Sequence, residues 1–364
     1  MKKRIGILTS GGDCPGLNAT IRGVAKAAYG SMECEIIGIR DGFQGLIDDD
    51  VVAMEPKDFS GILTRGGTIL GTHRTPFKTM RKIEADGVDK VKNMVETYKK
   101  HELDCIVCLG GNGTHKNANL LREEGLNVIG LPKTIDNDIF GTDITFGFQS
   151  AVDIATEVID RIHTTADSHD RVMLVELMGN KAGWLTLHAG VAGGADIILI
   201  PEIPYDDNVI IDALRKRQAG GKNFSIIAIA EGAKSMEEAL MSKEEYRIYR
   251  EGSKYPASSY RLAQLIQART GLETRVTIPG HQQRGGSPSP FDRVLATRLG
   301  AYAAKLIKEE TYGMTVAICH DDVIAVPLEE VAGLTKLVPL DHNLIETGEL
   351  IGINFGNNLQ RENN

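Results

Sequence analysis

The sequence predicts an α/β protein with two domains, each built on a mostly parallel sheet that helices cover on both faces. Short apolar runs alternate with helical patterns along the chain, which is typical of α/β proteins. The apolar runs are continuous rather than alternating, as expected of parallel strands that are buried on both faces. At 364 residues the chain is also longer than one hydrophobic core usually supports, which favours two domains.

The predicted strands each end in a cluster of glycine, proline or polar residues, and they span residues 5–8, 35–39, 105–109, 128–131, 172–177, 197–200 and 226–229. The predicted helices span residues 17–29, 88–101, 114–124, 149–166, 208–219, 258–270 and 291–309. The polar stretch 236–254 is interpreted as a solvated insertion or a helical hairpin on the surface. Because parallel α/β sheets bind ligands at the carboxyl ends of their strands, the glycine clusters there are candidate sites.

The composition argues against several classes of protein. With a net charge of −8 and few basic runs, binding to nucleic acid is not expected, since such binding rests on neutralised phosphates. No apolar run reaches transmembrane length, and the one near the start is too short for a signal peptide, so no membrane partner is expected. The five cysteines are odd in number and lie mainly in apolar runs, which predicts reduced thiols in the cytoplasm. Cys105 and Cys108 are interpreted as buried structural thiols rather than a redox or zinc pair.

Three glycine-rich loops follow predicted strands or turns, and they span residues 9–18, 65–76 and 109–115. In the first, backbone N–H groups and a helix start suit a phosphate, although a tight structural turn explains the same residues. In the second, Arg74 offers a fork of donors to phosphate oxygens. In the third, Asn112 and Thr114 carry side-chain oxygens where a helix cap is expected, so a simple capped turn is the alternative there.

The loop at residues 132–139, PKTIDNDI, places two carboxylates two positions apart beside a lysine. Phosphoryl transfer needs a group that accepts the alcohol proton, a cation near the phosphate oxygens, and accurate alignment. Asp136 and Asp138 are therefore candidates for a base and a metal-organising group. Further along the chain, Glu231 is a candidate acceptor for sugar hydroxyls, and four cationic residues could hold a sugar phosphate, with ion pairs or helix caps as the alternative; these are Arg171, Arg275, His281 and Arg284.

Six motifs in order resemble those of the 6-phosphofructokinase family, namely GGDCPGLN (11–18), GGTILG (66–71), GGNGT (110–114), PKTIDND (132–138), MGN (178–180) and HQQRGGSPSPFDR (281–293). The resemblance spans residues 4–335. It implies two similar three-layer α/β domains with mostly parallel sheets and the active site in the cleft between them. The implied nucleotide-binding domain is 1–147 plus 283–333, and the sugar-phosphate-binding domain is 148–282 plus 334–364.

The resemblance further implies that ATP, with Mg²⁺, phosphorylates D-fructose 6-phosphate to fructose 1,6-bisphosphate, the committing step of glycolysis. Asp136 would be the base, Asp138 would organise magnesium, and Arg74 would stabilise the transferring phosphoryl group. The implied ATP site consists of Gly11, Arg74, Thr75, Gly111, Asn112, Gly113 and Thr114. The implied substrate site consists of Thr134, Ile135, Asp136, Arg171, Met178, Gly179, Asn180, Glu231, Arg275, His281, Gln282, Gln283 and Arg284.

The family contains both ATP and pyrophosphate users, which differ at the positions of Gly113 and Lys133. Glycine leaves room for the nucleotide where pyrophosphate users typically place Asp, so Gly113 favours ATP. Lys133 typically accompanies pyrophosphate, but a mixed group within the family carries both residues and uses ATP, and this chain resembles that group. Asn112 stands where the best-known bacterial ATP enzymes carry a magnesium-binding Asp, so it would hold the ion more weakly or through water.

Two further expectations follow from the resemblance. Arg171 and Arg275 resemble arginines that a neighbouring subunit lends to the 6-phosphate, so a homodimer or homotetramer with shared active sites is expected. The family's effector site is represented only incompletely, by Arg22, Lys26 and Lys222, so effector control is expected to be weak or absent. The alternatives are pyrophosphate as the donor, a non-catalytic sugar-phosphate or nucleotide sensor, and an NAD-linked dehydrogenase, which the glycine spacing of the first loop disfavours.

Overall fold

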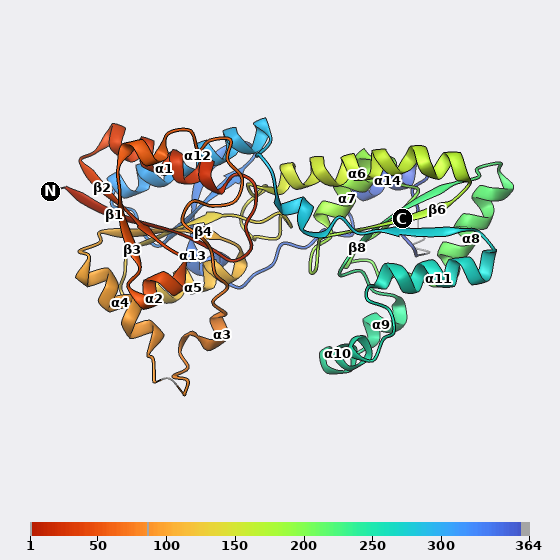
Figure 1. Ribbon diagram of the computed structural model, residues 1–364, viewed down its shortest axis with the longest axis horizontal. Coiled ribbons are helices and arrows are strands. Elements are labelled where there is room, and N and C mark those ends of the chain that lie inside the picture. The colour runs from red at the N-terminus through yellow and green to blue at the C-terminus, as the bar shows by residue number, and fades with distance from the viewer. Residues whose placement is uncertain (1, 86, 358–364) are drawn as a thin grey trace. The chain divides into compact units, whose positions relative to one another are not determined.

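The computed structural model describes residues 2–85 and 87–357, and the chain divides into two compact units (Figure 1). Unit 1 comprises Met1–Ser150 and Arg284–Lys336, and unit 2 comprises Ala151–Gln283 and Leu337–Asn364. The chain therefore leaves unit 1, builds most of unit 2, returns to complete unit 1 and ends in unit 2. Each unit has a sheet between layers of helices, which confirms the predicted α/β class with mostly parallel sheets.

Within the described part of unit 1, the strands form one seven-stranded sheet in the order β11-β10-β5-β4-β1-β2-β3. Its strands are β1 (Lys3–Ser10), β2 (Cys34–Ile39), β3 (Val51–Met54), β4 (Cys105–Gly110), β5 (Val128–Pro132), β10 (Met314–Cys319) and β11 (Asp322–Pro327). The two edge strands, β3 and β11, pair antiparallel and the strands between them pair parallel. β4 and β5 are buried along their whole length, as their unbroken apolar runs require.

Helices cover both faces of this sheet (Figure 1). On one face lie α1 (Leu17–Ser31) and α12 (Pro290–Lys308), and on the other lie α2 (Phe43–Asp48), α4 (Lys90–Lys100) and α5 (Asn112–Glu123). Shorter segments are η1 (Pro56–Phe59), α3 (Phe77–Met80) and α13 (Leu328–Val331). α1 and α12 pack backbone to backbone at Gly300, where a Cβ would lie 2.6 Å from the Thr20 carbonyl oxygen, so only glycine fits.

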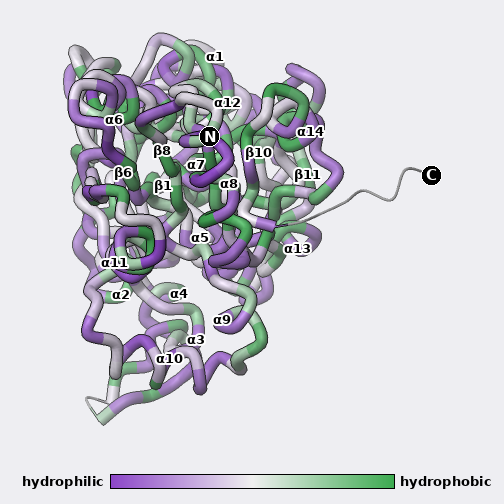
Figure 2. The backbone as a smooth tube through the Cα atoms, turned by 90° about the vertical axis from the view of Figure 1, so that its right-hand side faces the viewer, coloured by the Kyte–Doolittle hydropathy of each residue, from purple (hydrophilic) through white to green (hydrophobic). Residues whose placement is uncertain are grey.

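The described part of unit 2 holds a four-stranded parallel sheet in the order β7-β8-β6-β9. Its strands are β6 (Val172–Leu177), β7 (Ile197–Leu199), β8 (Ser225–Ala230) and β9 (Thr274–Thr277), and η2 (Gly280–Arg284) follows β9. On one face lie α6 (Phe148–His169), α7 (Trp184–Ala192) and α14 (Asn343–Leu350), and on the other lie α8 (Asp207–Ala219) and α11 (Ser258–Thr270) (Figure 1). The apolar colouring of the strands in Figure 2 matches a core that the sheet shares with α8 and α11.

Most predicted elements are confirmed, and two of them, the strand 172–177 and the helix 258–270, have the predicted bounds. The stretch 236–254 forms two short helices, α9 (Met236–Leu240) and α10 (Lys243–Glu251), which project from the body of unit 2 (Figure 1). Both begin with a Ser capping box, and α10 has no buried residue, as expected of a surface hairpin. Cys105 and Cys108 are free and fully buried, as predicted. In the described residues no helix is long and apolar enough to cross a membrane.

Candidate functional site

Three of the sequence-predicted loops of unit 1 meet at one edge of its sheet. β1, β4 and β5 are parallel neighbours, with Ser10 opposite Gly110 and Gly110 opposite Pro132. The loops that begin at Gly11, Gly111 and Lys133 therefore leave the sheet side by side, although some 100 residues of sequence separate the first from the others. The carboxyl edge of a parallel sheet is where α/β proteins bind ligands, so the structure places these candidates at the expected edge.

Two cations lie against the backbone of the first glycine loop. The buried ammonium of Lys133 donates to the Gly12 carbonyl, and the Arg284 guanidinium donates to the Asp13 carbonyl at 3.2 Å. A Cβ on Gly12 would lie 2.8 Å from Nη1 of Arg284, so this glycine lets the guanidinium approach the loop. Burial lowers the pKa of Lys133. The loop is thus held by two positive groups next to the edge where an anion would bind.

The loop with Arg74 and Thr75 packs against both neighbours. The backbone N–H of Gly11 donates to the His73 carbonyl at 3.3 Å, and Asn117 on α5 donates from Nδ2 to the Thr75 carbonyl at 3.0 Å. Arg74 is exposed, so its guanidinium is accessible to a ligand. The Thr75 hydroxyl is buried and has no hydrogen-bond partner in the described residues, which is a feature of groups that pair with a ligand or water.

At the start of α5 the structure contradicts the alternative of a capped turn. The N-cap is Gly111, Asn112 is the first helical residue, and no side chain caps this helix, so Asn112 and Thr114 are not capping residues. The Asn112 amide donates to the Leu334 carbonyl at 2.5 Å, and the Thr114 hydroxyl donates to the Ser10 carbonyl at 3.3 Å. The uncapped N–H groups of the first helical turn are therefore available to phosphate oxygens, which the helix dipole also favours.

His115, the fourth residue of α5, fixes the start of this helix through both ring nitrogens. Its Nδ1 lies 3.0 Å from the Gly111 carbonyl and its Nε2 lies 2.9 Å from the Thr315 hydroxyl. Because a carbonyl only accepts, Nδ1 carries the proton, and the single proton of the Thr315 hydroxyl is shared between Nε2 and the Gly130 carbonyl, which lies 3.1 Å away. Burial lowers the pKa of His115 to about 4, so the ring is neutral at physiological pH. No spacing pattern in the sequence indicates this contact, because Thr315 lies on a distant strand.

The loop after β5 carries both candidate carboxylates and is folded tightly on itself. The Asp136 N–H donates to the Thr134 hydroxyl at 3.0 Å, and the Thr145 hydroxyl donates to the Thr134 carbonyl at 2.8 Å. Asn137 has a left-handed backbone with φ 50° and accepts at Oδ1 from the Thr145 N–H at 3.1 Å. Asp136 and Asp138 are half-buried. The neck of the loop is therefore closed by hydrogen bonds, whereas the two carboxylates beyond it are only partly covered.

A divalent ion shared with nucleotide phosphates fits these residues better than a site made only of protein ligands. The described residues contain no cluster of three or more His, Cys, Asp or Glu side chains that could hold a metal. Mg²⁺ typically uses one or two carboxylates, with phosphates and water completing its shell, and Asp138 is the candidate carboxylate in this loop. The Asn112 amide oxygen already accepts from the Gly333 N–H at 3.3 Å, which leaves it only one further lone pair.

In unit 2 the candidate substrate residues gather at the carboxyl ends of β6 and β8. The Glu231 N–H donates to the Leu177 carbonyl at 2.8 Å, and the Met178 N–H donates to Oε1 of Gln283 at 3.3 Å. A Cβ on Gly232 would lie 2.0 Å from the Asn180 carbonyl oxygen, so the two loops touch through bare backbone. Gln283 is fully buried and structural, whereas Asn180, Glu231, His281 and Gln282 are exposed.

Arg171 and Arg275 lie elsewhere in unit 2. Arg171 precedes β6 and Arg275 is on β9 opposite Met173, so both are at the amino end of the sheet. The six residues of β6 separate Arg171 from Met178, a span of about 20 Å, and Arg275 lies opposite the second of these residues. Both guanidinium groups pair with Glu273, with Arg171 Nε 3.0 Å from Oε2, and they lower the pKa of this carboxyl. Unit 2 therefore does not bring these arginines together with the other substrate candidates.

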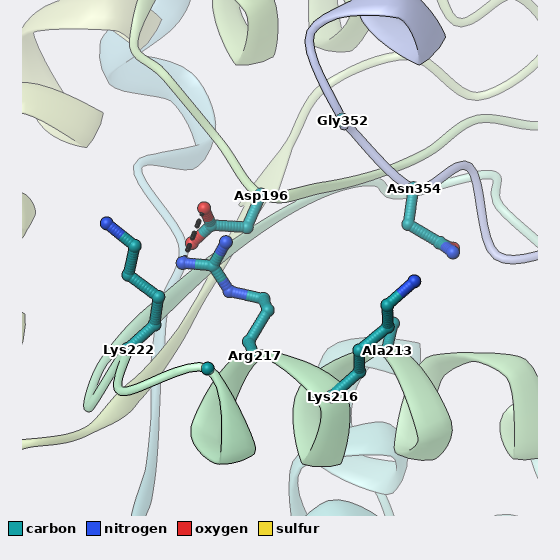
Figure 3. Close-up of a pocket in the computed structure, with 8 residues that line it drawn as sticks. Asp196, Ala213, Lys216, Arg217, Lys222, Gly352 and Asn354 are labelled. Atoms are coloured by element: carbon teal, nitrogen blue, oxygen red, sulfur yellow. Dashed lines mark ion pairs between the residues drawn. The ribbon is translucent and has the colours of Figure 1, made fainter.

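A separate basic cavity of about 320 Å³ in unit 2 contains Lys222 (Figure 3). Arg217 on α8 pairs with Asp196 at 2.7 Å in its centre, and in Figure 3 Lys222 lies on the other side of this pair from Lys216 and Asn354. Burial raises the pKa of Asp196. Asp196 thus already balances the charge of Arg217. The expectation that effector control is weak or absent stays a prediction.

Comparison with known proteins gives one consistent result. The family model described as Phosphofructokinase matches residues 4–307. The ATP-dependent 6-phosphofructokinase of Spirochaeta thermophila is 59% identical over 357 residues, covering 97% of this chain and 98% of its own length. The ATP-dependent 6-phosphofructokinase 3 of Bacteroides thetaiotaomicron is 50% identical, covering 97% of this chain and 100% of its own length. The structure of phosphofructokinase from Saccharomyces cerevisiae is similar with a TM-score of 0.78 and 32% identity over 90% of this chain, which spans 45% of the yeast chain.

Proposed function

Because this chain belongs to the phosphofructokinase family, we propose that it transfers the γ-phosphoryl group of ATP to the 1-hydroxyl of D-fructose 6-phosphate. The product would be fructose 1,6-bisphosphate, and the reaction is the committing step of glycolysis. One observation carries the proposal: the half-buried carboxylate of Asp136 lies on a hydrogen-bonded loop at the same edge of the sheet from which the two glycine loops begin. A base and an anion-binding helix start are thereby held on one rigid frame.

The chemical step is a displacement at phosphorus. Asp136 accepts the proton of the 1-hydroxyl while this oxygen forms its bond to the γ-phosphorus and the bond to the β-phosphate oxygen breaks, which releases ADP. Arg74, whose guanidinium is exposed at the nucleotide loop, would stabilise the charge on the transferring oxygens. Thr134 and Ile135 precede the base on the same loop and would line the acceptor sugar.

Unit 1 would bind the nucleotide. The candidate contacts are Gly11, the unpartnered hydroxyl of Thr75, and the N–H groups from Gly111 to Thr114 at the uncapped start of α5. Mg²⁺ would bind through the nucleotide phosphates and the carboxylate of Asp138, with Asn112 at most a weak or water-mediated ligand, and would neutralise phosphate charge.

Unit 2 would bind the sugar phosphate. Met178, Gly179, Asn180 and Glu231 meet at the ends of neighbouring strands, where exposed side-chain oxygens and N–H groups can reach sugar hydroxyls. His281 and Gln282 follow in η2 and would add donors, with Gln283 holding the loop beneath them. Arg284, the last residue of η2, belongs to unit 1 and would add a donor from there. The buried free thiols agree with the reducing conditions of the cytoplasm, which is the proposed location.

The decisive substitution is Asp136→Asn. The amide keeps the shape of the side chain but cannot accept the proton, so kcat is expected to fall by roughly 10²–10⁴-fold while the KM for fructose 6-phosphate changes little. Asp322→Asn, an exposed carboxylate in the same unit, is the matched control and should keep full turnover. Unchanged turnover in Asp136→Asn would remove Asp136 as the base.

Donor choice rests on Gly113. No atom lies within 4 Å of a Cβ built at Gly113, and its φ is not positive, so the backbone accepts a side chain without strain. Initial rates with fructose 6-phosphate and Mg²⁺, measured in parallel with ATP and with pyrophosphate, decide the donor. Activity with ATP alone supports the proposal, whereas activity with pyrophosphate alone would assign the alternative pyrophosphate-dependent reaction. Activity with neither donor would favour the sensor.

We infer a homodimer or homotetramer with shared active sites, and the position of the arginines supports it. Arg171 and Arg275 lie about one strand length from the other substrate candidates of their own unit 2. Their guanidinium groups would instead bind the 6-phosphate in the active site of a second subunit. Dissociated and reassembled mixtures of Asp136→Asn and Arg171→Ala chains test this arrangement. Recovery of activity in the mixture is expected, because a hybrid interface would contain one intact site. No recovery, with mixed oligomers present, would place the arginines outside the active site.

A further inference from the structure

A short segment at the end of unit 1 contacts two of the loops assigned above. Residues 332–336, here called the strap, follow α13 and precede the point where the chain enters unit 2. The Gly333 N–H donates to Oδ1 of Asn112 at 3.3 Å, and Nδ2 of Asn112 donates to the Leu334 carbonyl at 2.5 Å and reaches the Thr335 hydroxyl at 3.2 Å. The strap is thereby fastened to the start of α5.

The last residue of the strap, Lys336, holds the loop that carries Asp136. Its backbone N–H donates to the Asp138 carbonyl at 2.9 Å, on the limb that leaves β5. Its ammonium donates to the Thr142 carbonyl at 2.8 Å and to the Asp143 carbonyl at 2.9 Å, on the returning limb. A bridge between Ile139 and Thr335 lies between these contacts. One residue therefore joins both limbs of the loop.

The returning limb is anchored to the sheet beneath it. The Asp143 N–H donates to the Ile318 carbonyl at 2.8 Å, and the Ile318 N–H donates to the Thr142 hydroxyl at 2.9 Å. β10 thus fixes one limb, and Lys336 transfers this fixed position to the limb with Asp136 and Asp138. Bonds from an ammonium to carbonyl oxygens are charge-assisted and stronger than neutral hydrogen bonds, so the connection is stiff.

We propose that Lys336 is a positioning residue for phosphoryl transfer, which sets the distance between the two limbs of the 134–145 loop and so aligns the carboxylate of Asp136. The inference rests on the proposed function, because Asp136 is its target. Lys336 need touch neither substrate. Its loss is expected to slow the chemical step far more than it weakens the binding of ATP or fructose 6-phosphate, since the misalignment affects the base.

The test uses the full-length protein at a temperature where every variant is folded. In Lys336→Met the side chain keeps its length but loses its donors, and kcat is expected to fall by about 10–100-fold with both KM values within about threefold. Lys336→Arg restores donors to both carbonyls and should recover most of the lost kcat. The control is Lys90→Met, because Lys90 is 13% exposed, bonds the Thr79 carbonyl at 3.4 Å and pairs with Glu84, outside this loop. It should keep the parental kcat.

A double-substitution cycle separates alignment from a general loss of folded enzyme. If Lys336 acts through Asp136, adding Lys336→Met to Asp136→Asn should lower kcat by less than about threefold, because the base is already gone. A further 10–100-fold loss in the double variant, or an unchanged kcat in Lys336→Met alone, would overturn the inference. Should Lys336→Met not fold, Lys336→Gln is measured against the same criteria. A large loss of kcat in Asp136→Asn, together with an unchanged kcat in the Lys336 variants, refutes only the role of Lys336. An unchanged kcat in Asp136→Asn refutes the proposed base itself.

Discussion

Asp292 on α12 is expected to be one of the most important residues for the stability of unit 1. Its carboxylate is fully buried and accepts from the Gly147 N–H at 3.0 Å, the Ser150 N–H at 2.8 Å and the Ser150 hydroxyl at 2.6 Å. These N–H groups belong to the start of α6, so Asp292 caps a helix from another part of the chain. Asp292→Ala would leave both N–H groups buried without an acceptor.

The expected loss can be worked out from these contacts. Each orphaned buried donor costs about 1–3 kcal/mol and the lost hydroxyl bond costs about 1 kcal/mol, so the total loss is about 3–7 kcal/mol. For a unit of about 200 residues, 1 kcal/mol corresponds to roughly 2–4 °C, so the transition of unit 1 should move down by roughly 6–28 °C. Asp292→Asn keeps one acceptor oxygen and should lose about half as much.

Calorimetry at fixed protein concentration measures this shift. The control is Asp321→Ala, because Asp321 is 91% exposed in its ion pair with Arg298, and such surface pairs contribute about 0–1 kcal/mol. A shift for Asp292→Ala no larger than that of the control would refute the reasoning, since it would mean that the N–H groups find other acceptors or water. A shift of the predicted size for Ala and about half for Asn would support it.

Three further outcomes are expected. Since the pKa of His115 is lowered to about 4 from ~6.5 in the unfolded chain, unfolding takes up a proton in this window. The free energy of unfolding should therefore fall by up to about 3 kcal/mol as pH drops from 6.5 to 4, and His115→Gln should flatten this dependence in urea titrations. Gly113→Asp should raise the KM for ATP at least about tenfold by charge repulsion, whereas Gly113→Ala should not, as steady-state rates will show. Gly232→Ala should raise the KM for fructose 6-phosphate, because the new Cβ collides with the Asn180 carbonyl. Gly252→Ala is the control, since a Cβ there meets only an ordinary contact at 3.4 Å, and equal KM values for the two variants would contradict the prediction.

Most strands with a continuous apolar run and a clear end were predictable from the sequence, although β10, with four consecutive buried residues, was missed. The strand 172–177 is an example of a predictable strand, because Val172–Leu177 is buried throughout, follows Asp170-Arg171 and is followed by the turn residues Gly179-Asn180 after Met178. The edge strands β3 and β11 were missed because half-buried antiparallel edges carry only a weak pattern. α7 was missed for the opposite reason, since it is apolar around nearly its whole circumference and shows no helical period.

The candidate site was predictable in its residues but not in its contacts. The glycine loops and the Asp136 loop stand out locally because each follows a buried strand. The sequence left a capped turn at Asn112 open as an alternative, because a side chain at a helix start has the same sequence signature whether it bonds its own helix or a distant segment. Lys336 was missed altogether, since its partners near Asp138 lie almost 200 residues earlier in the chain.

The interrupted course of the chain has a consequence for its synthesis. β5 ends at Pro132 and its parallel neighbour β10 begins only at Met314, after most of unit 2 has been made. At about 5–20 residues per second, a ribosome needs roughly 10–40 s to cross this interval, during which the nascent first unit has an open apolar strand edge. The strands of unit 2, β6 to β9, all lie in the single segment Ala151–Gln283, so this unit can assemble its sheet first. The nascent chain is therefore most exposed to unwanted strand pairing at β5 until translation reaches β10.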